Sequence, residues 1–206
     1  KQYEMRKIYS DKKYPFLRFF LGDIRDYSRL SRAFDDIDII IHAAALKHVP
    51  FCEYNPFEAT KTNVVGTENM VRASLINNVS KFLLVSTDKV VDPTSCLGAS
   101  KLLAERLVIN ANNVKGDKKT IFACARFGNV IGTRGSILPF FQRQINKNHN
   151  LTVTDKKMTR FFMTIEDAVE SIVDSIFLMK GNEVFIPKKL KLFKIIDLAE
   201  SLLKRS

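Results

Sequence analysis

The sequence predicts an α/β fold built on a doubly wound parallel sheet, and three observations lead to this prediction. Short β-rich runs alternate with helical patterns along the chain. Several of these runs are almost continuously apolar, as expected for strands that helices bury on both faces. Small or polar residues follow the runs at their carboxyl ends, where sheets of this kind bind their ligands.

The composition fits a single globular unit. The 206 residues can bury the core of one α/β domain, or of one domain and a small lobe. No stretch approaches the roughly 18 consecutive apolar residues of a membrane helix. Cys52, Cys96 and Cys124 have no metal-ligand spacing and suit a reducing compartment. The net charge of +11 is scattered through loops and helix ends, so a Lys-rich surface that steers phosphorylated substrates is favoured over a nucleic-acid interface.

The elements follow in order from apolar periodicity and capping signals. Strands are predicted at residues 16–21, 37–41, 82–85, 121–125 and 184–186. Helices are predicted at residues 1–9, 26–34, 55–77, 99–111, 137–145, 165–179 and 193–203. Asp26 is a suitable cap for the second helix, and Asn55-Pro56 is a typical start for the third. Residues 151–154 and 160–164 are predicted to be short extended pieces, so the spacing changes in the last quarter of the chain.

Four segments of small or polar residues fall at predicted strand ends and should meet at one edge of the sheet. They are Gly22-Asp23, Ala43 to Ala45, Ser86 to Lys89 and Gly128-Asn129. Gly22-Asp23 fits a plain turn, or an Asp that accepts a hydrogen bond from an adenine. The three alanines fit either tight helix–strand packing or the close approach of a cofactor.

Ser86-Thr-Asp-Lys89 is the segment that packing explains least well. Ending a buried strand in two charged residues costs free energy unless the charges pair. One interpretation is a structural ion pair between Asp88 and Lys89. The other uses both groups in proton transfer, with Lys89 poised as a base and Asp88 as a proton donor.

Other polar residues give weaker signals. Lys101 lies one helical turn after Leu97, on the same face, and its place just after the Ser86–Lys89 strand is what singles it out. Arg160 is suited to a bidentate phosphate contact, or to a surface ion pair. The three histidines do not form a metal-ligand set, so no metal site is predicted, and His42 is expected to be a core residue.

Eight motifs spread over nearly the whole chain carry a family resemblance. They are Gly22-Asp-Ile-Arg-Asp26, His42-Ala-Ala-Ala-Leu-Lys-His-Val-Pro50, Glu53-Tyr-Asn-Pro56, Lys61-Thr-Asn63, Ser86-Thr-Asp-Lys89, Arg126-Phe-Gly-Asn-Val130, Gly132-Thr-Arg-Gly-Ser136 and Met158-Thr-Arg-Phe161. With them the sequence resembles the polysaccharide-biosynthesis (CapD-like) branch of the extended short-chain dehydrogenase/reductases. That branch contains the UDP-N-acetylglucosamine 4,6-dehydratases.

The resemblance implies a Rossmann-like fold that lacks its first two strands in this chain. It implies a partial NAD(P)-binding domain at residues 1–147 and a partial substrate-binding lobe with interleaved helices at residues 148–206. The implied activity is that of a lyase, a UDP-sugar 4,6-dehydratase of bacterial surface polysaccharide or glycan synthesis. A hydride leaves sugar C4, water is eliminated across C5 and C6, and the hydride returns to C6, so a tightly held NAD or NADP is regenerated in each turnover.

The resemblance also implies roles for individual residues. Asp88 would protonate the leaving C6 hydroxyl, Lys89 would take the C5 proton, and Lys101 would bind the nicotinamide ribose. The implied catalytic residues are Thr87, Asp88, Lys89 and Lys101. The implied cofactor-binding residues are Asp23, Ile24, Ala43, Ala44, Ala45, Asn63, Ser86 and Lys101. The implied substrate-binding residues are Lys47, Thr87, Asn129, Ser136 and Arg160.

Two departures from the family pattern qualify these expectations. Leu97 stands where the family has its active-site tyrosine, so C4 oxidation needs another base, by hypothesis Thr87 or a water that relays the proton toward Lys89 or Lys101. The glycine-rich pyrophosphate fingerprint is absent, and the chain begins with Lys1. We therefore expect a parent protein that is longer at both ends. For this chain alone we expect a displaced or exchanged first strand and weak dinucleotide binding, which a micromolar dissociation constant would contradict.

Two alternatives remain, a nucleotide-sugar epimerase and a non-catalytic fragment or binding module. The expected partners are a UDP-sugar substrate and further copies of the chain in a homo-oligomer, with no nucleic acid. The expected location is the bacterial cytoplasm, with membrane association only through regions outside this chain.

Overall fold

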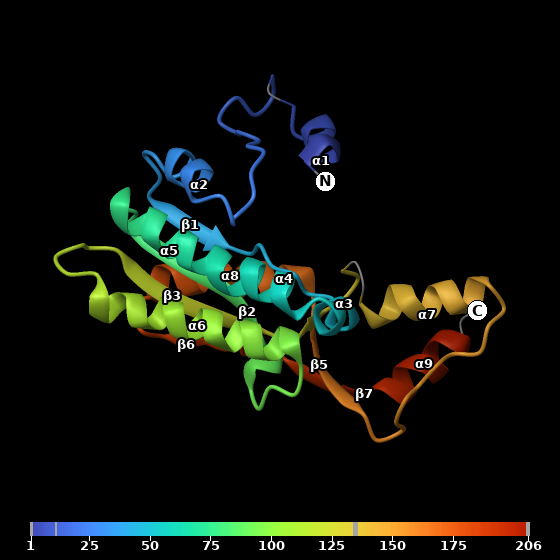
Figure 1. Cartoon of the computed structure of the whole chain (residues 1–206). Helices are drawn as coiled ribbons and strands as arrows, with labels where there is room; N and C mark the ends of the chain where they lie inside the picture. The colour runs from blue at the N-terminus through green and yellow to red at the C-terminus, as the bar shows by residue number, and fades with distance from the viewer. Residues whose placement is uncertain (1, 11, 134–135, 205–206) are drawn as a thin grey trace.

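The computed structural model describes residues 2–10, 12–133 and 136–204, and a four-stranded parallel sheet lies at its centre (Figure 1). The strand order is β1 (Ile39–His42), β2 (Lys81–Thr87), β3 (Ile121–Phe127) and β6 (Val184–Phe185). All three pairings are parallel. The predicted parallel sheet is confirmed, and each predicted strand except the first has a counterpart.

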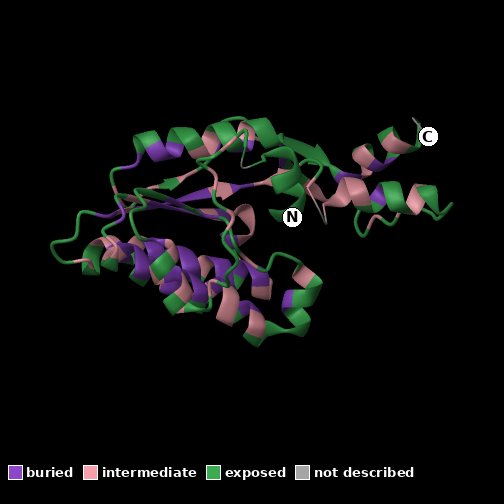
Figure 2. Ribbon diagram, turned by 90° about the horizontal axis from the view of Figure 1, so that it is seen from above, coloured by how far each residue is buried: buried purple, intermediate pink, exposed green. Residues whose placement is uncertain are grey.

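Helices cover both faces of the sheet. Phe82 and Leu84 of β2 enter one core with α5 (Gly66–Ile76) and α6 (Cys96–Val114). Leu83, which points to the opposite face, enters a second core with α8 (Ile165–Leu178). Buried residues accordingly lie on the strands and on the inward sides of the helices (Figure 2). Because both faces are covered, the strands are continuously apolar, and this made them recognisable in the sequence.

Side-chain caps set where three helices begin. Asp26 accepts a hydrogen bond from the backbone N–H of Arg29 and starts α2 (Tyr27–Ala33). Thr164 caps α8 in the same way. Ser95 accepts a hydrogen bond from the backbone N–H of Gly98, so α6 begins at Cys96, three residues before the predicted start. The earlier start places Leu97 and Gly98 in the first turn of α6.

The predicted helix at residues 55–77 is a composite. It consists of α4 (Pro56–Thr60), a π-helical turn (Lys61–Val65) and α5, and a short helix, α3 (Val49–Tyr54), precedes it. Asn55 occupies the cap position, but its amide donates to the carbonyl of Phe51 instead of capping α4. A π-turn rotates the residues that follow it relative to a regular helix, and such turns are frequent at functional sites.

A second, three-stranded sheet contains β4 (Asn129–Val130), β5 (Thr159–Met163) and β7 (Lys191–Lys194). It packs with α7 (Ile137–Asn146) and α9 (Ile195–Leu203) around Phe141, Phe162 and Ile195. The chain returns to the main sheet through α8 and β6 before β7, so the two sheets share the last third of the sequence. The helix predicted at 193–203 begins at Ile195 because β7 pairs with β5, and residues 151–154 form no strand. The domain boundary at residue 147 stays a prediction.

The strand predicted at residues 16–21 is wrong. These residues follow α1 (Gln2–Ile8) outside the sheet and pair with no strand; Phe16 is 74% and Leu21 81% exposed. A β-rich composition makes a strand only where a neighbouring strand takes up its backbone hydrogen bonds, and within the described residues β1 pairs with β2 alone. Displacement of this segment was expected. The described residues form no helix long and apolar enough to cross a membrane.

Candidate active site

A cavity of about 490 Å³ opens at the carboxyl ends of β2 and β3, between the main sheet and the second sheet. This is the edge at which the sequence analysis expected the chemistry, and the size suits a small-molecule ligand. Nine predicted site residues line the cavity: Ala43, Ala45, Lys47, Ser86, Thr87, Lys89, Lys101, Asn129 and Ser136.

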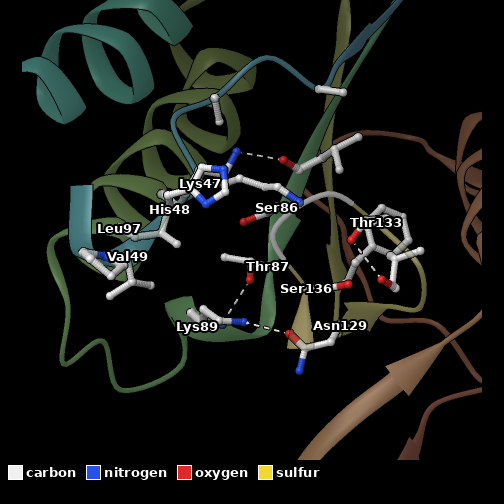
Figure 3. A pocket seen from close by; sticks show the side chains of 18 residues that line it. Lys47, His48, Val49, Ser86, Thr87, Lys89, Leu97, Asn129, Thr133 and Ser136 are labelled. Atoms are coloured by element: carbon white, nitrogen blue, oxygen red, sulfur yellow. Dashed lines mark hydrogen bonds between the residues drawn. The ribbon is translucent and has the colours of Figure 1, made fainter. Parts of the chain in front are cut away.

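A chain of polar contacts joins Thr87, Asp88, Lys89 and Asn129 beside the cavity, and Figure 3 shows its link between Lys89 and Asn129. The Thr87 hydroxyl donates to the Asp88 carboxylate at 3.0 Å. The Lys89 ammonium donates to the same carboxylate oxygen at 2.9 Å and to the amide oxygen of Asn129 at 3.4 Å. The Asp88–Lys89 ion pair that the sequence allowed is therefore present, and it is only partly buried. Asp88 does not line the cavity itself but holds two residues that do.

Close packing against α6 holds the turn that carries Asp88 and Lys89. Residues Asp88–Val90 form a single 3-10 turn after β2. Gly98, in the first turn of α6, lies so close to the Lys89 carbonyl oxygen that a Cβ at this position would collide with it. The close approach of Gly98 to the Lys89 carbonyl thus fixes the Asp88–Lys89 ion pair against the same helix that carries Lys101.

Leu97 and Lys101 both line the cavity from α6. Leu97 is 5% exposed and packs with Cys52 and Ala59, so it serves as core as well as cavity wall. Lys101 is equally buried, and its ammonium donates to the carbonyl of Val85 at 2.7 Å. Burial, which penalises the charged form, lowers the pKa of Lys101 to about 8. An ammonium has three N–H donors, and two of them remain for a ligand.

Two buried hydroxyls in the cavity wall have no hydrogen-bond partner among the described residues. They belong to Ser86 on β2 and to Ser136 at the start of α7. Buried polar groups are nearly always satisfied in proteins, so each is a position where a ligand atom can bind. Both face the interior of the site together with Thr133 and Asn129 (Figure 3).

Three other predicted cofactor residues lie away from the cavity. Asp23 forms an ion pair with Arg25 at 2.7 Å, whose hydrogen bonds lower the pKa of the Asp23 carboxyl. Ile24 packs against Gly66 of α5, and Ala44 does not line the cavity. The Gly22-Asp23 segment also follows no strand, so three of the four chemistry-bearing segments meet at this edge of the sheet instead of four.

Asn63, the fourth, supports the site from behind. It is 1% exposed, and its amide oxygen accepts from the Leu46 N–H at 2.8 Å. Its amide nitrogen donates to the Leu46 carbonyl and to the Ser100 hydroxyl. These contacts tie the cavity loop at residues 43–48 to α6, and the π-turn is what presents Asn63 to them. Arg160 also lies outside the cavity, exposed on β5, and its guanidinium donates to the Thr159 carbonyl.

The cavity has lining residues that the sequence analysis did not select. His48, Val49 and Pro50 contribute from the start of α3, and Thr133 contributes from the loop before α7. All four belong to motifs that carried the family resemblance, but none had a charge or a strand-end position to mark it. The short helix α3, which begins at Val49 with Pro50 in its first turn, was the missing element.

His42 is a core residue, as expected. It is buried on β1, and its Nε2 lies 3.0 Å from the Thr67 hydroxyl, while Nδ1 has no partner among the described residues. Burial lowers the pKa of His42 to about 3, so the ring is neutral. Within the described residues, no group of three or more His, Cys, Asp or Glu side chains could hold a metal ion.

The chain is similar to known proteins over nearly its whole length. The family described as "Polysaccharide biosynthesis protein" matches residues 1–206. The chain belongs to this family. Its relatives include a UDP-N-acetylglucosamine 4,6-dehydratase (inverting) from Campylobacter jejuni, 45% identical over 98% of the chain and 60% of that protein. They also include a UDP-glucose 4-epimerase from Rickettsia bellii, 41% identical over 91% of the chain and 54% of the relative.

Two solved structures superpose on nearly the whole chain. Pen from Bacillus thuringiensis superposes with a TM-score of 0.94 and 42% identity, over 99% of the chain and 64% of Pen. DesIV, a dTDP-glucose 4,6-dehydratase from Streptomyces venezuelae solved with NAD and TYD, superposes with a TM-score of 0.88 at 23% identity, over 98% of the chain and 67% of DesIV. The family member described here thus spans little more than half the length of the curated relatives it matches.

Proposed function

We propose that the chain carries the catalytic centre of a UDP-N-acetylglucosamine 4,6-dehydratase. The observation that carries the proposal is the hydrogen-bonded array of Thr87, Asp88, Lys89 and Asn129 at the cavity mouth. The supporting comparison is the Campylobacter jejuni dehydratase, 45% identical over nearly the whole chain. The product is a UDP-4-keto-6-deoxy sugar for surface polysaccharide or glycan synthesis.

The Asp88–Lys89 pair suits an elimination because the Asp88 carboxylate and the Lys89 amine share one proton, which can lie on either group. As an ion pair, Lys89 has the proton. With the proton on Asp88, the pair has a neutral amine and a carboxylic acid, which are the base and the acid that the reaction needs. Lys89 then takes the proton from sugar C5, Asp88 gives its proton to the leaving C6 hydroxyl as water, and the pair returns to its ionic form.

The cavity residues fit a nicotinamide dinucleotide. Ala43 and Ala45 leave room for close approach, the Ser86 hydroxyl is free to bind, and Lys101 has N–H donors to spare for ribose hydroxyls. The bound NAD or NADP supplies hydride transfer, from sugar C4 and back to C6, and so stays in the site through the turnover. Four other predicted cofactor residues do not line the cavity, so they would contact only a part of the cofactor that extends beyond it. They are Asp23, Ile24, Ala44 and Asn63.

The substrate would bind against the residues that line the other side of the cavity. Asn129 and Ser136 present a polar atom each, and Lys47 adds a positive charge for the diphosphate. Thr133, which lines the same wall, joins them in this proposal. Arg160 reaches the UDP moiety only if its side chain leaves the Thr159 carbonyl.

Product analysis tests the activity. The protein is incubated with UDP-N-acetylglucosamine and NAD or NADP, and the product is identified by mass spectrometry and NMR. A product lighter by one water, with a methyl group at C6, supports the dehydratase. A product of unchanged mass with inverted C4 supports the epimerase alternative, which the Rickettsia bellii relative favours. If UDP-N-acetylglucosamine remains unchanged although the cofactor is bound, both the dehydratase and the epimerase proposals are overturned.

Substitution of Lys89 tests the role of the acid–base pair. Lys89→Ala should lower kcat at least about 100-fold, because the C5 proton loses its acceptor. Lys61→Ala is the matched control, since Lys61 forms a similar exposed ion pair, with Glu58 at 3.0 Å, outside the cavity. Equal turnover in the two variants would contradict the assignment.

Assembly and location complete the proposal. The chain is taken to form a homo-oligomer in the bacterial cytoplasm, reaching a membrane only through regions outside this chain. Exposed apolar side chains on the helical layer, among them Phe57, Val65 and Leu103, support self-association. Sedimentation velocity tests it: a concentration-independent monomer would contradict the oligomer.

A further inference from the structure

A chain of buried hydrogen bonds joins the end of β1 to the helix beside it. His42 is the last residue of β1, and its Nε2 lies 3.0 Å from the Thr67 hydroxyl on α5. That hydroxyl also donates to the backbone carbonyl of Asn63 at 2.7 Å. All three residues are 1% exposed, so these contacts are shielded from solvent. Each polar atom in the chain therefore depends on its partner within the protein.

The two distances determine which nitrogen of His42 carries a proton. Two oxygens approach to 2.7 Å only with a hydrogen between them, and a carbonyl has none, so the single hydroxyl proton of Thr67 lies on its bond to Asn63. The 3.0 Å contact to Nε2 then needs a hydrogen from the imidazole. Burial lowers the pKa of His42 to about 3, so the ring is neutral and its one N–H is at Nε2.

The same helical segment holds the chain a second time, at Leu46. The side-chain amide oxygen of Asn63 accepts from the Leu46 N–H at 2.8 Å, and its amide nitrogen donates to the Leu46 carbonyl at 3.1 Å. The residues between His42 and Leu46 form a loop, Ala43 to Ala45, which we call the alanine loop. It is fixed at one end by His42 and at the other by Leu46, and its first and last residues line the cavity.

We propose that His42 is a positioning residue for the cavity: as the Nε2–H tautomer it donates to Thr67, and this bond acts with the Asn63–Leu46 bonds to hold the alanine loop at both ends. The loop then keeps its place in the cavity wall, where its small side chains leave room for a ligand. Only this effect on ligand binding rests on the proposed function. The residues proposed for proton transfer lie at the end of β2, outside the loop, so its position should affect binding more than chemistry.

Thr67→Val tests the role of the hydroxyl, because valine has nearly the shape of threonine but forms no side-chain hydrogen bond. The substitution leaves the His42 N–H without its acceptor and the Asn63 carbonyl without its donor. Exchange of the Leu46 amide hydrogen should become at least about fivefold faster, as expected for one lost hydrogen bond. Thr67→Ser keeps the hydroxyl and should keep the native exchange rate.

Ser74→Ala is the matched control on the same helix. Ser74 is 0% exposed, and its hydroxyl donates to the Met70 carbonyl at 2.7 Å, as the Thr67 hydroxyl does to the carbonyl of Asn63. The bond between Ser74 and Met70 lies wholly within α5. Its loss should therefore leave the exchange of the Leu46 amide at the native rate.

A double variant keeps the proposal testable if Thr67→Val does not fold. His42→Phe/Thr67→Val replaces both polar partners by apolar groups, so it leaves no imidazole N–H buried without an acceptor. The hydroxyl that anchors the Asn63 carbonyl is still missing in this variant. Exchange of the Leu46 amide should accordingly be faster than in the native protein, as in Thr67→Val.

The measurements use the free protein without ligand. NMR of the histidine ring nitrogens reads the tautomer, and the signals of His42 are those that the double variant lacks. They should show a proton on Nε2 and a bare Nδ1. Hydrogen exchange of the Leu46 amide is followed by NMR in the same samples. In an active enzyme, Thr67→Val should also raise KM for UDP-N-acetylglucosamine about fivefold with kcat little changed.

Each outcome decides for or against the proposal. Support comes from the Nε2–H tautomer with faster Leu46 exchange in Thr67→Val, or in the double variant where Thr67→Val does not fold, and native exchange in Thr67→Ser and Ser74→Ala. A proton on Nδ1, native exchange without the Thr67 hydroxyl, equally fast exchange in Ser74→Ala, or a native KM in an active Thr67→Val enzyme overturns it. Since the NMR measurements need no substrate, absence of dehydratase activity would refute the proposed function and leave their result standing.

Discussion

Replacing the buried lysine of the site should make the protein more stable while removing a group that the proposed reaction uses. Lys101→Met replaces the side chain by an unbranched apolar one that is a single atom shorter, and so removes the charge. Because the pKa of Lys101 is lowered in the folded state, the unfolded chain binds more protons between about pH 8 and pH 10.5. The stability of the native protein therefore rises with pH across this window. The variant lacks this term, so its advantage is largest below about pH 8 and disappears above pH 10.5.

The size of the gain follows from the shift. At about 1.4 kcal/mol per pKa unit, lowering the pKa from 10.5 to about 8 corresponds to about 3 kcal/mol of folding free energy lost while the lysine is charged. Methionine leaves the Val85 carbonyl without its donor, which costs about 1 kcal/mol. The free energy of unfolding should therefore increase by about 2 kcal/mol at pH 7.

Urea denaturation at pH 7 and pH 10, followed by circular dichroism, measures the gain in the free energy of unfolding and its dependence on pH. Lys115→Met is the control, because the Lys115 ammonium also donates to a backbone carbonyl, that of Thr120, but from a half-exposed side chain. The control should lack the stability gain of Lys101→Met at pH 7, because its ammonium is not buried. A Lys101→Met variant that is less stable than the native protein at pH 7, or whose difference does not change between the two pH values, would refute the reasoning.

Three further substitutions follow from contacts at the site. Gly98→Ala pushes the Lys89 carbonyl and its turn out of place, and kcat should fall at least about tenfold with KM little changed. Asn63→Ala breaks three buried hydrogen bonds to Leu46 and Ser100, and urea denaturation should show a loss of about 2–4 kcal/mol. Leu97→Tyr overfills the cluster of Leu97, Cys52 and Ala59, so it should lower stability by about 1–3 kcal/mol without raising kcat.

Each of these has an outcome that contradicts it. Gly98→Ala with native kcat would mean that the turn at Asp88 tolerates displacement. Asn63→Ala with native stability would mean that the cavity loop is held elsewhere. A faster Leu97→Tyr enzyme would show that the position still accommodates a phenol in reach of the sugar.

The parts of the fold that depend on local sequence patterns could be predicted from the sequence. The strands β2 and β3 are apolar on both faces, and Asp26 is a typical helix cap, so these elements could be predicted. Ser95 was not recognised as the cap of α6, and the predicted start of that helix lay three residues too late. The segment at residues 16–21 could not, because pairing depends on a neighbour that composition does not reveal. Nor could the π-turn, since it replaces one helical hydrogen-bond register by another within an unbroken helical pattern.

The same division holds for the site. Ser86, Thr87 and Lys89 could be predicted because a buried strand that ends in polar residues needs an explanation. The role of Asn63 could not, because it depends on which groups lie opposite its side chain in space. Lys101 was selected by its position after the strand, but its burial became visible only in three dimensions.

In the proposed reaction, the hydrogen bonds around Thr87 bear on the proton that leaves the C4 hydroxyl. Leu97 is buried in an apolar cluster and can neither accept nor relay it. Thr87 donates to the Asp88 carboxylate, and the same carboxylate oxygen accepts from the Lys89 ammonium, so the hydroxyl is coupled to the ion pair through Asp88. The Lys101 ammonium instead donates to the Val85 carbonyl, and none of its hydrogen bonds among the described residues reaches Thr87. Of the two relays that the sequence allowed, these contacts favour the one from Thr87 through Asp88 toward Lys89. Because an amine holds one added proton at a time, Lys89 must release the C4 proton to solvent before it accepts the proton from C5.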